Sequence, residues 1–240
     1  SIRRQRQMCI RDRREYRLFV ILELMRVPLM AFLLVIVAIL WILYPVHRAI
    51  KKSQALVIGS NAYEQHPISP TMKILVMGDS TAVGIGVSEP TLSIAGRIGA
   101  KYPSSDITNI SRFGMRLAEL QKIITEMPAD TEYDLIVLQI GANDVTHFTS
   151  LEEVKLTLRS ILEVATTKGS EVIVLSAGNI GLSPVFRFPI SAILSKRTRD
   201  VREIYIVETN KYENVTYIDL YHERESDVFS SNIERYYAMD

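Results

Sequence analysis

Short apolar runs alternate with helical patterns from residue 72 onward, and this alternation limits the possible folds more than any other feature. The runs are rich in Ile, Val and Leu, as expected for strands covered on both faces. They cover 73–77, 106–110, 133–140, 171–176 and 214–219. Helical patterns cover 91–102, 116–127, 151–168 and 190–211. The alternation predicts an α/β fold, with a parallel sheet between two layers of helices.

The helix predicted at 151–168 has the clearest boundaries. Ser150 and Glu153 form a capping-box pattern at its start, and Gly169 follows its end. Between them, apolar residues recur at helical spacing and form a single stripe. This segment therefore predicts an amphipathic helix that packs on the sheet.

An uncharged apolar run precedes this domain at residues 27–44. It has about 18 residues, near the lower limit for crossing roughly 30 Å of hydrocarbon. Residues 18–22 extend it if Glu23 and Arg26, one helical turn apart, form an ion pair. Trp41 and Tyr44 lie at its far end, where interfacial aromatic residues are common. We expect residues 18–44 to form an N-terminal transmembrane helix that anchors the chain in a membrane.

Two other interpretations of this run are a buried core helix and a cleaved signal peptide. A core helix usually has some polar face, and this run has none. A signal peptide has a shorter apolar region and a cleavage site of small residues, which Trp41–Pro45 does not resemble. Both alternatives fit less well than a membrane anchor.

Charges around the anchor bear on its orientation. The basic segment 1–17 has more arginines than residues 45–71 have basic residues, so the N-terminus should face the cytoplasm and the domain the other side. However, residues 7–13 resemble translated adapter sequence, and if the chain up to residue 13 is such sequence, only Arg14 and Arg17 remain and the bias disappears. Cys9, the only cysteine, lies in that stretch and excludes an intramolecular disulfide. We expect a tether at 45–71 and the globular domain at 72–240.

The overall composition excludes some functions. The net charge is +1 and the pI is about 7.8, which argues against a nucleic-acid partner. No Cys/His cluster has the spacing of metal ligands. We therefore expect neither nucleic acid nor metal at the site.

Three groups suited to acyl transfer follow the first three predicted strands. Ligands of parallel α/β sheets bind beyond the carboxyl ends of the strands. Ser80 supplies a hydroxyl, and Gly114 supplies a backbone N–H that no Cβ shields. Asn143 supplies an amide donor. Donors aimed at one point make an oxyanion hole, worth roughly 3–4 kcal/mol of barrier for each donor.

These motifs resemble three sequence blocks of the SGNH (GDSL) hydrolase superfamily. The matching residues are Gly78-Asp79-Ser80, then Gly114, then Gly141-Ala142-Asn143-Asp144. The resemblance implies a three-layer α/β/α flavodoxin-like fold, and it is closest to the bacterial esterase, thioesterase and lysophospholipase branch. It further implies a small ester or lipid substrate and no metal or organic cofactor.

The resemblance also assigns roles to individual residues. Ser80 is the nucleophile, and its own N–H, the Gly114 N–H and the Asn143 amide form the oxyanion hole. Taken singly, each of these residues also fits a structural role in a turn or cap. Asp79 and Asp144 are expected to hold their loops through backbone N–H groups.

The histidine base is the missing part of the pattern. A serine hydroxyl is a weak nucleophile until an oriented base takes its proton. The family supplies this base in an Asp-x-x-His block, and Asp240 falls at the position of its Asp, with the His three residues further on. We therefore expect a sequence truncated before this His, and little activity from residues 1–240 alone. His222 is an alternative base without the block's context, and His147 is assigned no catalytic role.

Three functions remain open from the sequence. The first is a membrane-tethered serine hydrolase of carboxylic esters or thioesters. The second is an O-acyltransferase that uses the same site on a surface glycan, and the third is a non-catalytic binding module. The acyl group is not readable, because Pro184, Phe186 and Phe188 after the fourth strand can line an acyl site or pack in the core.

Overall fold

The computed structural model describes residues 26, 28–48, 51 and 61–221. The chain divides after Arg48 into two units, Ser1–Arg48 and Ala49–Asp240. The first unit contains the helix Pro28–Arg48, which is long and apolar enough to cross a membrane and has no buried part. The predicted start of this helix, at residue 18, lies outside the described residues.

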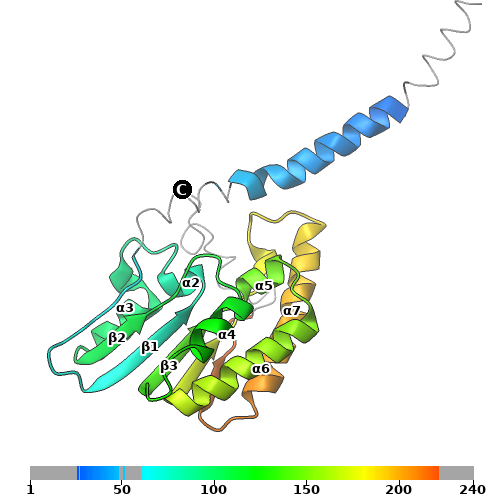
Figure 1. Cartoon of the computed structure of the whole chain (residues 1–240). Coiled ribbons are helices and arrows are strands. Elements are labelled where there is room, and N and C mark those ends of the chain that lie inside the picture. Colours follow the sequence, from blue (N-terminus) through cyan, green and yellow to red (C-terminus); the bar gives the residue numbers. More distant parts are fainter. Residues whose placement is uncertain (1–25, 27, 49–50, 52–60, 222–240) are drawn as a thin grey trace, which may run out of the picture. The chain divides into compact units, whose positions relative to one another are not determined.

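The second unit is built on a five-stranded sheet (Figure 1). The strands are β1 (Met72–Gly78), β2 (Ser105–Asn109), β3 (Tyr133–Gln139), β4 (Gly169–Leu175) and β5 (Val215–Ile218). Every neighbouring pair is parallel, and the order is β2-β1-β3-β4-β5. This is the flavodoxin-like order, whose crossovers change direction between β1 and β3. The predicted strands and the α/β class are confirmed.

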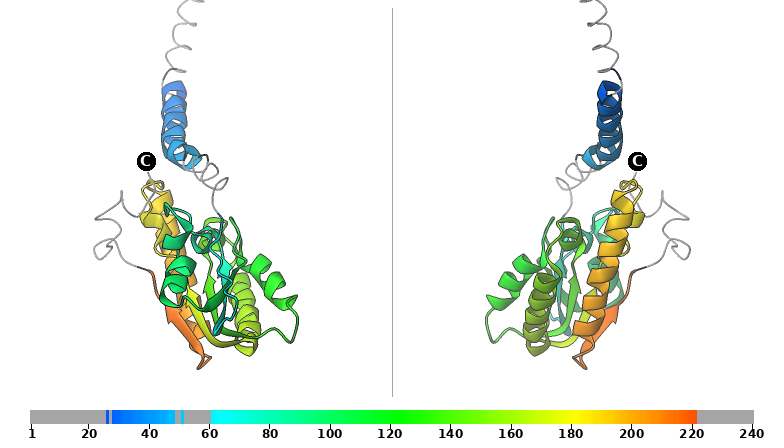
Figure 2. Two further views of the ribbon diagram at one scale, coloured as in Figure 1. Left: turned by 90° about the vertical axis from the view of Figure 1, so that its left-hand side faces the viewer. Right: turned by 90° about the vertical axis from the view of Figure 1, so that its right-hand side faces the viewer.

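Helices flank both faces of the twisted sheet (Figure 2). The long helices are α3 (Ile94–Lys101), α4 (Leu117–Thr125), α6 (Leu151–Lys168) and α7 (Ile190–Thr209). The side chains of α4, α6 and α7 pack in one apolar cluster with β1, β3 and β4, whereas α3 packs in a second cluster against the same strands and β2. The three-layer architecture is therefore observed directly.

The short helices were not apparent from the sequence. These are α2 (Ser80–Val83), α5 (Ala142–Thr146) and the 3-10 turns η1 (Pro90–Leu92) and η2 (Ile180–Leu182). Each has too few residues to show a helical period. The predicted cap of α6 is confirmed, since the Ser150 hydroxyl accepts a hydrogen bond of 3.1 Å from the Glu153 N–H.

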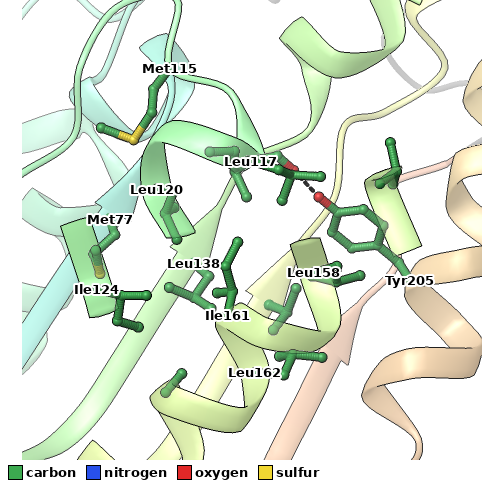
Figure 3. Packing of buried hydrophobic residues seen from close by; sticks show 14 of the residues in the cluster. Met77, Met115, Leu117, Leu120, Ile124, Leu138, Leu158, Ile161, Leu162 and Tyr205 are labelled. Atoms are coloured by element: carbon green, nitrogen blue, oxygen red, sulfur yellow. Dashed lines mark hydrogen bonds between the residues drawn. The ribbon is translucent and has the colours of Figure 1, made fainter. Parts of the chain in front are cut away.

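The larger cluster fills the space between the sheet and α4, α6 and α7 (Figure 3). Leu120 and Ile124 of α4, Leu158 and Ile161 of α6 and Leu138 of β3 are at most 1% exposed. Burying each such side chain contributes roughly 1.5–3 kcal/mol. This packing fixes the helices on the sheet, and with them the loops at the carboxyl ends of the strands.

Residues 61–71, within the predicted tether, lie against the edge strand β2. Gln65 and Ile107 exchange backbone hydrogen bonds of 3.1 and 2.7 Å in an antiparallel bridge. The Gln65 side-chain amide also donates to the Ser105 carbonyl at 2.8 Å, and the Thr71 N–H donates to the Ser104 carbonyl at 2.9 Å. This part of the chain is docked on the domain.

An ion-pair cluster between α6 and α7 should make stability depend on pH. The Glu208 carboxylate is 1% exposed and accepts hydrogen bonds from Arg159 at 3.0 and 3.2 Å and from Lys211 at 2.6 Å. The bonds from Arg159, with smaller help from Lys211, lower the pKa of Glu208 against the opposing effect of burial.

A carboxyl group whose pKa is lower in the folded than in the unfolded chain stabilises the fold at pH values above its unfolded pKa of 4.5. This stabilisation is lost as the pH falls through the pKa of the folded chain. Glu208→Gln should therefore cost about 1–2 kcal/mol near pH 7, since both cations are partly exposed. The cost should shrink as the pH falls below 4.5. Thermal unfolding of the unmodified chain and of Glu208→Gln, from pH 7 to below pH 4.5, checks this expectation. A stability difference that does not change with pH would contradict it.

Candidate active site

The carboxyl ends of β1 and β3 meet where the crossovers change direction. Gly78 is in register with Gln139, and a Cβ on Gly78 would lie only 2.0 Å from the Gln139 carbonyl oxygen. The next residue, Asp79, donates its N–H to the same oxygen at 3.0 Å. Only glycine allows this approach. Ser80 follows at once as the first residue of α2, and it is half-buried at this edge.

Asp79 connects the first and third loops of this edge. Its carboxylate is 1% exposed and accepts hydrogen bonds from the Thr81 N–H at 2.9 Å and the Thr81 hydroxyl at 2.7 Å. The Ala142 N–H of the third loop lies near it and favours its charged form. Burial raises the pKa of Asp79, and these hydrogen bonds partly oppose the rise. The expected structural role is confirmed, because Asp79 caps α2 beside Ser80 and so holds the turn after β1.

The second loop is tied to both of the others. Arg112 donates its N–H to the Gly78 carbonyl at 3.0 Å, and the Asn143 side-chain amide donates to the Met115 carbonyl at 3.0 Å. Gly114 lies between these two contacts with φ +73°, and a Cβ placed there would meet no atom within 4 Å. An amide carries two N–H donors, so the bond to Met115 leaves one for another acceptor. The structure thus brings the loops of Ser80, Gly114 and Asn143 together.

Asp144 fixes the other side of the third loop. Its buried carboxylate accepts hydrogen bonds from the Leu117 N–H at 3.0 Å and the Thr149 hydroxyl at 3.1 Å. It therefore holds the first residue of α4 against α5. The sequence predicted only that Asp144 holds its own loop, where the Thr149 hydroxyl binds it, and not that it reaches α4. Burial raises the pKa of Asp144, and the Leu117 and Thr149 hydrogen bonds partly offset this effect.

Tyr205 supports the third loop from α7, and sequence reasoning missed it. Its hydroxyl donates to the Ile140 carbonyl at 3.0 Å from inside the large cluster (Figure 3). The next residue, Gly141, has φ +121°, and a Cβ there would lie 2.7 Å from this hydroxyl. In the sequence, Tyr205 is only one more large residue on the buried face of its helix. Nothing in the pattern of α7 reveals that its hydroxyl reaches the end of β3.

Removing this hydroxyl should destabilise the domain. Tyr205→Phe leaves the buried Ile140 carbonyl without this donor, which should cost about 1–3 kcal/mol of unfolding free energy. Tyr102→Phe is the matched control, because Tyr102 is 43% exposed. Urea denaturation of the two variants checks the expectation. Equal stabilities would show that the Tyr205 bond contributes nothing.

The remaining candidates have varied surroundings. His147 is exposed, and its Nδ1 lies 2.8 Å from the Asn143 carbonyl oxygen. Phe186 packs against the large cluster, as the core interpretation expected, whereas Phe188 is 77% exposed. Asp240 and His222 lie outside the described residues. Among the described residues, no group of three or more His, Cys, Asp or Glu side chains is placed to hold a metal ion.

A family comparison covers the part of the chain that forms this site. The model of the GDSL-like lipase/acylhydrolase family matches residues 76–240, which is more than half of the chain. This range contains all three loops. No curated protein gives a significant match to the chain.

Several solved structures are similar to the chain at low identity. An acetylxylan esterase from Geobacillus stearothermophilus is 20% identical over 64% of this chain and 78% of its own, with a TM-score of 0.46. A member of the lipolytic protein G-D-S-L family from Veillonella parvula is 23% identical over 62% and 78%, with a TM-score of 0.47. A protein called TesA is 17% identical over 60% and 76%, with a TM-score of 0.49. These likenesses are too distant to assign site residues.

Proposed function

The chain belongs to the GDSL-like lipase/acylhydrolase family, and from this premise we propose that it hydrolyses carboxylic esters or thioesters through an acyl-enzyme on Ser80. The Ser80 Oγ attacks the carbonyl carbon of the substrate, and the alcohol or thiol leaves with a proton. Water then attacks the acyl-enzyme, releases the carboxylic acid and restores the serine hydroxyl. No step needs a metal or an organic cofactor.

The developing oxyanion is stabilised by three donors. The Ser80 N–H lies in the first turn of α2, where N–H groups lack partners within the helix. Gly114 has no Cβ to shield its N–H, and a Cβ added there would point into open space. The Asn143 amide is held by its bond to the Met115 carbonyl. Donors fixed in this way need no reorganisation as charge develops, and each lowers the barrier by roughly 3–4 kcal/mol.

A histidine takes the Ser80 proton and later returns it to the leaving group. In the family's Asp-x-x-His block the Asp orients this histidine, and Asp240 takes that role here. The activity and labelling experiments below use a chain in which the histidine of this block follows Asp240.

The observation that carries the proposal is the set of hydrogen bonds among the three loops. Asp79 donates its N–H to Gln139 at the end of β3, Arg112 donates to Gly78, and Asn143 donates to Met115. These bonds support a common site for the serine, the glycine and the asparagine. Separate structural roles for the three residues would not require their loops to be joined.

Covalent labelling tests the proposal. A fluorophosphonate probe should form an adduct on the peptide that contains Ser80, located by mass spectrometry. Asn143→Ala should slow labelling about 100-fold or more, because the adduct forms through an oxyanion-like transition state. Asn210→Ala is the matched control, since Asn210 is exposed at the end of α7 and should leave the rate unchanged. An adduct on another residue, or equal rates in both variants, would overturn the assignment.

The apolar helix favours one further candidate on the same site. A single-pass anchor at residues 18–44, with the domain outside the cytoplasm, would keep the acyl-enzyme near acceptors at the membrane surface. Transfer to a sugar hydroxyl would then compete with hydrolysis. Product analysis with and without a glycan acceptor separates the two: free carboxylic acid alone supports the hydrolase, and an acylated sugar supports the transferase.

A further inference from the structure

The strand β2 lies at an edge of the sheet, and residues 61–71, which we call the edge segment, lie along its outer side. Successive residues of a parallel strand bond alternately to one side and the other. Ile110, just after β2, donates its N–H to the Val76 carbonyl of β1 at 3.0 Å, so residues 106 and 108 also face β1. The residues of β2 that face outward are therefore Ser105, Ile107 and Asn109. An outer edge of this kind is a template for another strand unless it is covered.

The edge segment binds these outward groups with one backbone pair and two side chains. Gln65 exchanges backbone hydrogen bonds of 3.1 and 2.7 Å with Ile107, and its side-chain amide donates to the Ser105 carbonyl at 2.8 Å. The Asn109 N–H donates to the Glu64 carboxylate at 3.4 Å. The remaining outward N–H, that of Ser105, bonds to the turn before the strand at 3.0 Å. All three outward N–H groups of β2 therefore have partners within the chain.

The Gln65 side chain lies in a space that α3 leaves open. Its Oε1 accepts a hydrogen bond of 2.9 Å from the Tyr63 hydroxyl. A Cβ on Gly99 of α3 would lie 2.8 Å from both this Oε1 and the Tyr63 hydroxyl, so a larger residue there would push the edge segment away. Tyr63 also packs against the second apolar cluster. The segment is therefore held by apolar contact as well as by hydrogen bonds.

Once uncovered, this edge suits a second copy of the same strand. In an antiparallel pair centred on Ile107, this residue would exchange two backbone hydrogen bonds with its counterpart, as it does with Gln65. The one charged residue of β2, Asp106, would lie opposite Thr108 of the other copy, so that no like charges meet. The strand also has no lysine or proline, which commonly protect exposed edges.

We propose that the outer edge of β2 is a strand-pairing surface, and that the edge segment occupies it within the same chain and so prevents a second copy from binding there. Gln65 is the central residue, because it supplies both backbone and side-chain hydrogen bonds to β2. This surface depends on contacts within the domain, and not on the catalytic role of Ser80 or on the placement of the apolar helix.

Sedimentation of the full chain in detergent tests this surface. Gln65→Pro removes the N–H that binds Ile107 and the side-chain amide that binds Ser105. Its dimers should have a dissociation constant at least about tenfold lower than those of the unmodified chain, because the lost bonds no longer compete with those of a partner. Ser69→Pro is the matched control. Ser69 is exposed and its N–H bonds to no other described residue, so this variant should sediment as the unmodified chain does.

A synthetic peptide of residues 61–71 locates the contact. Added to Gln65→Pro, this peptide should occupy the edge of β2 and restore the monomer, whereas the same peptide with proline at position 65 should not. Dimers that persist with the unmodified peptide form elsewhere and would overturn the proposal. A folded Gln65→Pro that stays monomeric but binds the peptide would overturn the second copy as the partner.

Gly99→Leu gives an independent result if Gln65→Pro does not fold. Its side chain would occupy the space of Gln65 and Tyr63, while leucine favours the helix α3 itself. We expect the same shift toward dimers, with circular dichroism confirming that the variant is folded. Ala100→Leu is the matched control, because Ala100 is exposed on the same helix. Equal dissociation constants for these two folded variants would overturn the proposal.

Discussion

Ser80→Ala should reduce kcat/KM for a short-chain nitrophenyl ester about 1,000-fold or more, because no acyl-enzyme can form without the hydroxyl. Some activity above the uncatalysed rate should remain, since the three N–H donors still stabilise attack by water. Thermal stability should change little, because Ser80 is only half-buried and its backbone makes the contacts within α2. Initial rates and melting temperatures on the same preparation separate loss of chemistry from loss of fold.

Ser88→Ala is the matched control for this experiment. Ser88 is exposed in the loop that follows α2, and no catalytic role is assigned to it. Its variant should keep the activity of the unmodified protein. If Ser80→Ala also keeps full activity, the serine is not the nucleophile, although the chain remains a member of the family.

Gly78→Ala should destabilise the domain by about 3 kcal/mol or more, the range of severe overpacking. The added Cβ would lie 2.0 Å from the Gln139 carbonyl oxygen and 2.8 Å from the Ala82 Cβ. The first clash is with backbone of a central strand, which no side-chain rotation can relieve. We expect the melting temperature to fall by roughly 10 °C for a domain of this size.

Gly86→Ala separates the clash from the general cost of replacing a glycine. Gly86 has φ +90°, but a Cβ there would meet no atom within 4 Å. In Gly86→Ala the unfolding free energy should fall only by the cost of a Cβ in the left-handed region, about 1–2 kcal/mol. Similar melting temperatures for the two variants would show that β1 and β3 separate easily, and that Gly78 is not required for their approach.

Much of the fold could be predicted because the signals are local. Apolar runs in the positions of β1 and β3, and the stripe and cap of α6, follow from the order of residues along the chain. The short helices α2 and α5 could not be predicted, because helices of so few residues are too short to show a helical period. Residues 61–71 were expected to be tether, and no local pattern indicates that Gln65 pairs with Ile107.

The sequence by itself determined the α/β class, the apolar helix before the domain and the three motifs that follow successive strands, because these depend on residue type and spacing. Only the tertiary structure decided which loops touch. Asp79 binds Gln139, Asn143 reaches Met115, and Tyr205 supports Ile140 from α7. These contacts join residues far apart in sequence, and they depend on strand register and helix packing, which no local pattern encodes.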